Sequence, residues 1–258
     1  MKLKLTLLSS MLFLLACGLL GGTPTEMALP PSPTAEQTTI QPTQVPPTIQ
    51  PTQVPPTEAI IDPNYFRDDF NIKLESDWQW LREDPSQWSL TTVPGVLQIN
   101  VLSGHVSADD LPNILLRPAP QGDFQLETKL TFQPVANFQF AGIVIYQSPL
   151  DLIQVGRAYC DLPTTCAGDG LYIDYYQNGN LILPNFARAY TEGEIVYLRL
   201  IHESDTYTLQ SSPDGITWTL RGGQVSAMIP QQVGLVAGQN ETDPIPALFD
   251  YFEIKSLE

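Results

Sequence analysis

The chain of 258 residues is 43% hydrophobic and 16% charged, which excludes both a wholly disordered chain and a polytopic membrane protein. Its 28 acidic residues outnumber its 12 basic ones, and the formal net charge of -16 argues against binding to nucleic acids. Only two His and three Cys are present, so neither His-rich metal catalysis nor a disulfide-dense scaffold is expected. Because Pro disrupts helices and inner strands, the 24 prolines must be concentrated somewhere.

Residues 1–17 are typical of an export signal. Lys2 and Lys4 precede an apolar run from Leu5 to Leu15, which is too short for a membrane-spanning helix. The end of the segment, Leu14-Leu15-Ala16-Cys17, resembles the bacterial lipobox. This resemblance implies that Cys17 is lipidated and holds the chain on the cell membrane, facing the extracellular or periplasmic side. An ordinary cleavable signal with an incidental cysteine is the alternative.

Residues 18–63 lack the composition of a folded domain. They contain eleven of the prolines with many Thr and Gln and few aromatic or charged residues, so they cannot bury a core. Residues 40–48 and 49–57 both read I-Q-P-T-Q-V-P-P-T. Repeated Pro favours polyproline II at about 3.1 Å per residue, so we expect a stalk that reaches on the order of 100 Å. A disordered tether without a length requirement is the alternative.

Residues 64–258 are predicted to form an all-β domain. They hold 24 acidic and 10 basic residues, which leaves this segment a net charge of -14. From Phe124 to Phe132 every second residue is apolar except Thr128, the pattern of a half-buried antiparallel strand. Similar runs are Val96–Leu102, Ile114–Arg117, Phe138–Tyr146, Ile153–Tyr159, Leu171–Tyr176, Ile195–Ile201, Tyr207–Ser211, Thr217–Leu220, Val233–Ala237 and Ala247–Ile254.

Turn signals separate these runs, among them Asn178-Gly179-Asn180 and Asp214-Gly215. No long stretch shows a helical period with caps. The spacing therefore predicts a two-sheet antiparallel sandwich of jelly-roll type.

The cysteines Cys160 and Cys166 flank a five-residue insert directly after a predicted strand. In an exported protein this spacing predicts a disulfide that pins the loop, with a metal site as the alternative. The two histidines, His105 and His202, are isolated in sequence and are interpreted as surface or strand residues.

From Phe66 onward, a series of motifs resembles the concanavalin A-like sandwich at the C-terminus of family 43 glycoside hydrolases, the β-xylosidase group. No single element is specific, but their common order is. The motifs are residues 77–84, Trp88-Ser89-Leu90, Gly95 to Ile99, Asn113 to Arg117, Phe124 to Phe132, Phe140 to Tyr146, Val155-Gly156-Arg157, Tyr197 to Leu200, Asp214-Gly215 with Trp218, Val233-Gly234-Leu235 and Phe249 to Phe252.

The resemblance does not make the chain a glycosidase. In family 43 the catalytic carboxylates belong to an N-terminal propeller, whose place is taken here by the anchor and stalk. The E-x-D-x-x-E run of laminarinase-type sandwiches is absent, and Asp174 and Glu127 lack a same-face carboxylate nearby in sequence. Partners from separate strands remain open. No G-x-S-x-G motif indicates a nucleophile elbow.

Sugar recognition on such sandwiches combines aromatic platforms with side chains that bind vicinal hydroxyls. The two-residue strand period predicts Trp78, Trp80 and Arg82 on one face. Core packing, or an ion pair of a strand Arg with Glu83 or Asp174, is the alternative. The full set of predicted ligand-binding residues is Trp78, Trp80, Arg82, Arg117, Tyr146, Tyr172 and Arg199.

The same fold resemblance implies a structural calcium ion, held by an acidic residue near the first strand and one on the last strand. In this sequence the candidates are Asp69 and Asp250, and an acidic exported domain suits Ca²⁺. A strand-capping role for Asp250 is the alternative.

Three functions follow from these expectations. The first is a surface lipoprotein that displays a non-catalytic module for polysaccharide or oligosaccharide. The second is a glycoside hydrolase or lyase acting on plant-type polysaccharide. The third is an envelope module that binds a protein partner.

Overall fold

Residues 64–161, 168–182, 185–186, 189–190, 193–240 and 242–257 are described by the computed structural model. The signal, Cys17 and the stalk lie outside them, so lipidation, anchoring and the segment boundaries stay predictions. In the described part of the chain, no helix is long and apolar enough to cross a membrane.

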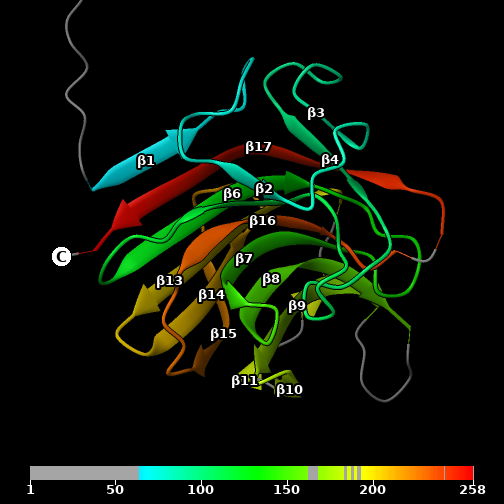
Figure 1. Ribbon diagram of the computed structural model, residues 1–258. Helices are drawn as coiled ribbons and strands as arrows, with labels where there is room; N and C mark the ends of the chain where they lie inside the picture. Colours follow the sequence, from blue (N-terminus) through cyan, green and yellow to red (C-terminus); the bar gives the residue numbers. More distant parts are fainter. Residues whose placement is uncertain are drawn as a thin grey trace, which may run out of the picture. The chain divides into compact units, whose positions relative to one another are not determined.

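The described residues form strands in two antiparallel sheets (Figure 1), which confirms the predicted all-β sandwich. Sheet A has the order β11 (Asn185–Phe186), β15 (Thr219–Val225), β14 (Thr206–Ser212), β13 (Ile195–Glu203), β6 (Phe124–Thr131), β17 (Ile245–Ser256), β4 (Leu97–Val101) and β3 (Trp88–Ser89), and β1 (Tyr65–Asp68) also pairs with β17. Sheet B has the order β10 (Asn180–Ile182), β9 (Gly168–Gln177), β8 (Asp151–Cys160), β7 (Phe140–Ser148), β16 (Gln232–Gly238), β5 (Ile114–Pro118) and β2 (Gln79–Leu81), and β12 (Ala189–Tyr190) pairs with β9.

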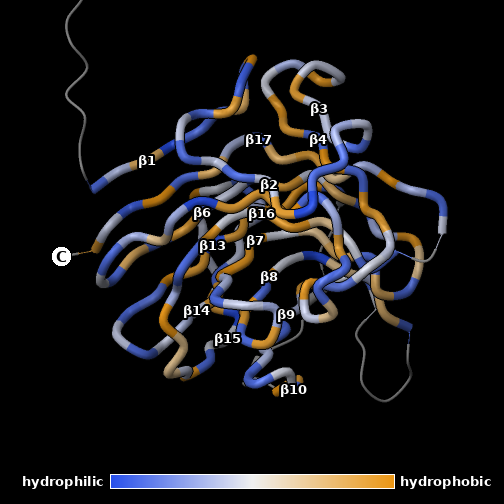
Figure 2. Tube along the Cα trace, viewed as in Figure 1, coloured by the Kyte–Doolittle hydropathy of each residue, from blue (hydrophilic) through white to orange (hydrophobic). Residues whose placement is uncertain are grey.

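The period of two along the strands sets which side chains are buried. In β6 the predicted apolar face, Phe124, Leu126 and Leu130, is fully buried in the core between the sheets. Figure 2 shows the same alternation as hydrophobic and hydrophilic positions that follow one another along the strands. At about 25 cal/mol per Å² of buried apolar surface, this common core is the main source of stability.

Short turns of the expected chemistry join several strands. Asn178 (φ 50°) and Gly179 (φ 76°) both take left-handed conformations between β9 and β10, as a type I′ hairpin turn requires. The strand predicted at Thr217–Leu220 instead runs Thr219–Val225 through Gly222 and Gly223. A register shift at Leu209/Gln210 of the neighbouring strand accompanies this displacement.

Sheet B is apolar on both of its faces. A second cluster lies on the side away from the main core and includes Val144 of β7, Leu152 of β8 and Val236 of β16. Val106 and Leu111 complete it from the connection between β4 and β5, residues 102–113, which we call the covering segment. Figure 1 shows this segment running in front of the strands of sheet B. The outer face of sheet B is therefore a partly covered surface rather than an open one.

Candidate functional site

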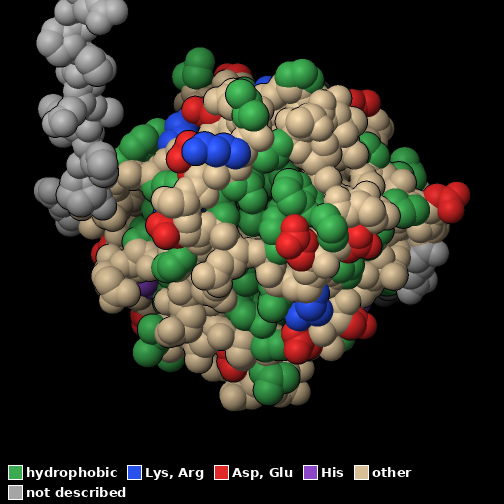
Figure 3. All heavy atoms as spheres, turned by 45° about the horizontal axis from the view of Figure 1, so that its top comes forward, with side chains coloured by type: hydrophobic (Ala, Val, Ile, Leu, Met, Phe, Trp, Pro, Cys, Tyr) green, Lys and Arg blue, Asp and Glu red, His purple; other side chains and the backbone are tan. Residues whose placement is uncertain are grey.

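The outer face of sheet B brings three tyrosines and two polar side chains together. Register places Tyr146 opposite Leu152 and Tyr176 in one row, and Gln154 opposite Asp174 in the next. Tyr172 lies two residues before Asp174, on the same face of β9. Tyr146 is buried, while Tyr172 and Tyr176 stay partly exposed. In Figure 3, hydrophobic side chains gather in the middle of the visible face, with acidic side chains beside them.

Next to Tyr172, two paired glycines leave this face of the sheet without side chains. Gly156 pairs with Tyr172 on one side and with Gly142 on the other. A Cβ added at Gly156 would lie 2.1 Å from the carbonyl oxygen of Ala141, so these positions accept no side chain. Glycine at such strand positions permits close approach of another group.

Asp174 is the carboxylate of this face. Gln154 Nε2 donates a hydrogen bond of 2.8 Å to Asp174 Oδ2, across the strands β8 and β9. Burial raises the pKa of the Asp174 carboxyl, while Gln154, His105 and Gln239 act in the opposite direction. His105 belongs to the covering segment, and Gln239 follows β16. Two strands and two connections thus converge on one carboxyl group.

The same environment shifts the pKa of two of the tyrosines. Burial raises the pKa of Tyr176, opposed by a hydrogen bond with Ser107 of the covering segment and reinforced by the nearby Asp174. Burial also raises the pKa of Tyr146, with a smaller contribution from Asp109. Both hydroxyls therefore stay protonated at neutral pH and can donate hydrogen bonds.

Arg82 reaches this face, although sequence alternation predicted it beside Trp78 and Trp80. Strand β2 ends at Leu81, and Arg82 has a φ of 56°, which breaks the two-residue period. Its Nε donates to the Leu111 carbonyl oxygen at 2.7 Å, and its Nη1 forms an ion pair with Asp109. Arg82 thereby holds the covering segment.

Of the three residues predicted on one face, Trp78 and Trp80 share a side and only Arg82 departs from it. Both tryptophans pack against the main core. The Trp78 ring centroid lies 5.2 Å from that of Phe252, and its Nε1 donates to Asp68. The Trp80 and Trp88 centroids are 4.7 Å apart. The core alternative considered from the sequence describes these tryptophans.

Arg117 also points away from the outer face of sheet B. Its guanidinium lies 3.1 Å from the Phe66 ring centroid and 5.4 Å from that of Trp78. Burial lowers the pKa of Arg117, while Asp77 and Asp68 raise it. This cation is part of the packing between the sheets.

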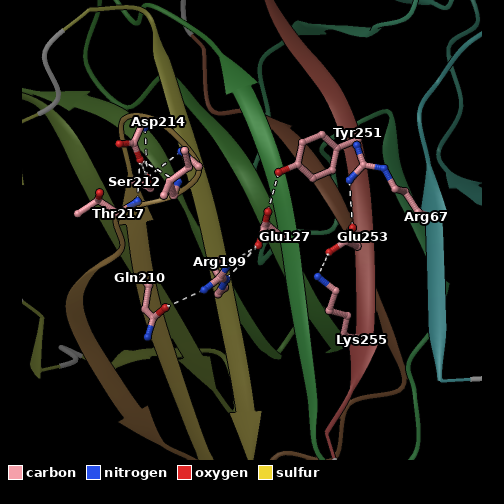
Figure 4. A network of polar contacts seen from close by, with 12 residues as sticks. Arg67, Glu127, Arg199, Gln210, Ser212, Asp214, Thr217, Tyr251, Glu253 and Lys255 are labelled. Atoms are coloured by element: carbon pink, nitrogen blue, oxygen red, sulfur yellow. Dashed lines mark hydrogen bonds and ion pairs between the residues drawn. The ribbon is translucent and has the colours of Figure 1, made fainter.

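Arg199 lies on the other sheet, in a network of polar contacts (Figure 4). Its Nε and Nη2 donate to Glu127 Oε2 at 3.0 and 2.8 Å, and its guanidinium lies 3.6 Å from the Trp218 ring centroid. Tyr251 donates to the other Glu127 oxygen at 2.7 Å. Arg199 and Arg82 therefore pair with Glu127 and Asp109, rather than with the Glu83 or Asp174 considered from the sequence.

The two calcium candidates each have a cationic partner within the chain. Asp69 accepts from Arg67 Nε at 2.8 Å, and Asp250 pairs with Lys129. Among the residues that the structure describes, no group of three or more His, Cys, Asp or Glu side chains is arranged to hold a metal ion. Calcium binding stays a prediction.

Cys160 is buried at the end of β8, and Cys166 lies outside the described residues. The disulfide between them therefore stays a prediction. His202 lies in β13, with ring centroids of Phe124 and Tyr207 at 4.9 and 4.7 Å, as a strand histidine.

Gln154, Tyr176, His105 and Asp109 were missed as site residues. A signal for the first two was present, because Gln154 interrupts an apolar strand and Tyr176 continues the face of Tyr172 and Asp174. His105 and Asp109 lie in the connection between β4 and β5, which has no repeating side-chain pattern from which their positions could be predicted.

Solved structures with the same fold include glycoside hydrolases. The GH43 protein BlXynB from Bacillus licheniformis is 22% identical, with a TM-score of 0.67, over 76% of this chain and 40% of that chain. A xylan β-1,4-xylosidase from Bacillus halodurans is 24% identical, with a TM-score of 0.66, over 79% of this chain and 41% of that chain. The chain thus spans about two fifths of these enzymes.

A β-glucanase of Bacillus licheniformis is 10% identical, with a TM-score of 0.53, over 75% of this chain and 99% of that chain. At such identities the likeness shows the fold alone. No curated protein matches the sequence. The family model of the β-xylosidase C-terminal concanavalin A-like domain matches residues 67–255. Since this match extends over well more than half of the sequence, the chain belongs to that family.

Proposed function

We propose that the protein is a surface-anchored lipoprotein whose sandwich domain binds carbohydrate without cleaving it. The observation that carries this proposal is the outer face of sheet B, where Tyr172 and Tyr176 are partly exposed beside Asp174 and Gln154. Aromatic rings that stack on a sugar, next to groups that bind its hydroxyls, form the chemistry of a sugar site. Family membership and the glycosidase neighbours support a carbohydrate ligand.

The polar groups of this face favour binding over hydrolysis. Retaining hydrolysis uses two carboxyl groups about 5 to 5.5 Å apart, one as nucleophile and one as acid. On the neighbouring strand, the side-chain amide of Gln154 donates a hydrogen bond to Asp174. Asp109, also near this face, is ion-paired with Arg82. An amide and a neutralised carboxylate fit recognition better than acid and base catalysis.

The segments before the domain would display it at a distance from the membrane. An anchor at Cys17 and the proline-rich residues 18–63 would hold the domain away from the membrane. The domain's own charge of -14, from 10 basic and 24 acidic residues in 64–258, suits neutral ligands. Calcium at Asp69, directly after β1, or at Asp250 of β17 would be structural, since both positions belong to the side of sheet A rather than to the outer face of sheet B.

Retention of the full chain on immobilised neutral polysaccharides tests this proposal. We expect retention on at least one glycan, without release of reducing sugar. Tyr172→Ala should weaken retention about tenfold or more, since an aromatic contact and its apolar area are lost. Arg199→Met, on the opposite sheet, is the matched control and should be retained like the unmodified chain. Release of reducing sugar would favour the hydrolase alternative.

A further inference from the structure

The covering segment is a loop whose two limbs contact each other. The backbone amide of Gln239, directly after β16, donates to the Gly104 carbonyl oxygen at 3.1 Å and fixes the first limb. Gly104 has a φ of 108°, and a Cβ added there would lie 2.9 Å from the Cα of Leu111 in the second limb. Between the limbs, the backbone amide of His105 donates to Asp110 Oδ1 at 2.7 Å. The loop is therefore closed by its own contacts.

Arg82 attaches the second limb to the end of strand β2. Its Nε donates to the Leu111 carbonyl oxygen at 2.7 Å, and its Nη1 pairs with Asp109. The backbone amide of Asn113 donates to the Arg82 carbonyl oxygen at 3.1 Å. The side chains of the ion pair are 25% (Arg82) and 58% (Asp109) exposed, and pairs this exposed contribute little to folding. Removal of the Arg82 side chain should therefore leave the domain folded but free the segment.

The middle of the covering segment meets the exposed tyrosines of the outer face of sheet B. Ser107 forms a hydrogen bond with Tyr176, and His105 lies close enough to Asp174 to interact with its charge. Tyr172 and Tyr176 both pack against the apolar cluster to which the segment contributes. His105 is exposed, and the other four side chains are partly exposed. Strand β9 and the segment therefore present groups to the same place, and a ligand can reach them from solvent.

We propose that the covering segment is one side of the sugar site and that Arg82 is the residue that positions it. This inference rests on the proposed function. A sugar ring lies against Tyr172 or Tyr176, and its hydroxyls bond to Ser107 and His105, whose side chains both donate and accept hydrogen bonds. Because the segment is already held in place, binding does not have to order it, which favours affinity. Arg82 itself is a positioning residue, which acts through the segment without touching the sugar.

Calorimetric titration of the full chain with neutral xylo-oligosaccharides tests the role of Arg82. Arg82→Met should weaken binding about fivefold to tenfold, since the segment must then be ordered when the ligand binds. Arg82→Lys keeps a cation beside Asp109 and should restore the affinity to within about threefold of that of the unmodified chain. Arg67→Met is the matched control, because Arg67 also pairs with an aspartate and its side chain is 32% exposed. It should lower the melting temperature but bind like the unmodified chain.

Unchanged affinity in Arg82→Met overturns the inference. An equal loss in Arg67→Met also overturns it, because the loss then follows from general destabilisation. If the unmodified chain binds neither this probe nor any other neutral glycan, the proposed function fails and the inference fails with it.

Hydrogen exchange of the ligand-free chain is a second measurement, which does not depend on the choice of glycan. The backbone amides of residues 104–111 should exchange faster in Arg82→Met than in the unmodified chain or in Arg67→Met. Addition of the xylo-oligosaccharide to the unmodified chain should slow exchange in the same residues. Equal exchange in Arg82→Met and the unmodified chain overturns the positioning role, and a segment that the bound sugar does not protect is no side of the site.

Discussion

The Glu127 carboxylate should contribute more to stability than any exposed acidic group of the same sheet. It accepts hydrogen bonds from Arg199 at 3.0 and 2.8 Å and from Tyr251 at 2.7 Å, and the ion-paired side chains are 11% (Glu127) and 21% (Arg199) exposed. Glu127→Gln keeps the shape of the side chain but removes the charge and one acceptor oxygen. Because hydrogen bonds to charged groups contribute about 1.5–3 kcal/mol, we expect a loss of about 2 kcal/mol in the free energy of unfolding.

Thermal unfolding followed by circular dichroism measures this loss. For a domain of 150–250 residues, about 2–4 °C corresponds to each kcal/mol, so the melting temperature should fall by about 4–8 °C. Asp69→Asn is the matched control, since Asp69 also pairs with an arginine but its side chain is 54% exposed. An exposed pair contributes about 0.2–1 kcal/mol. Equal shifts for the two variants would refute the assignment of Glu127 to a buried network.

Arg199 should contribute to stability but not to sugar binding. Arg199→Met should also lower the melting temperature, because it leaves Glu127 without its cationic partner. It should not change the affinity for sugar, since Arg199 lies on sheet A. Loss of sugar retention in this variant would return Arg199 to the binding residues.

Three further predictions concern other parts of the domain. Gly156→Ala should destabilise the protein by about 1–3 kcal/mol or more in chemical denaturation, because its Cβ would lie 2.1 Å from a backbone oxygen; a neutral effect would contradict this packing. Hydrogen bonds from the backbone of Thr217 and Ile216, and then from Ser212, lower the pKa of Asp214 to about 2. The stabilisation from Asp214 is therefore present above the ordinary pKa of 3.8 and is lost as the pH falls toward about 2, so the difference in melting temperature from Asp214→Ala should vanish there; a constant difference would contradict it. If calcium is bound, EDTA lowers the melting temperature and Asp250→Ala removes that effect; an unchanged melting temperature contradicts the ion.

The strands of the main core could be predicted because their side chains alternate. Phe124, Leu126 and Leu130 are buried as the period of two requires, and the predicted strand ends lie within a few residues of those observed. The same rule failed at Arg82, because a left-handed residue directly after a three-residue strand reverses the direction of the side chain. A local pattern carries no information about such a break.

The candidate site was harder to predict because its residues come from separate strands. Tyr146 and Tyr172 were predicted and do share the outer face of sheet B. The contact between Gln154 and Asp174 depends on the register of β8 against β9, which no motif in either strand specifies. For the tryptophans the sequence left two interpretations open, because aromatic residues at alternate positions suit a core as well as a binding platform, and the structure packs both against the core.

The central claim is that a neutral glycan binds on the outer face of sheet B. The most direct measurement is a titration of the isotope-labelled full chain with a retained neutral oligosaccharide, followed by backbone amide resonances. The account predicts shifts concentrated at Leu152–Gly156 and Tyr172–Tyr176, with sheet A unchanged around Arg199 and Trp218. Shifts centred on Arg199 and Trp218, with none on β8 and β9, would contradict it.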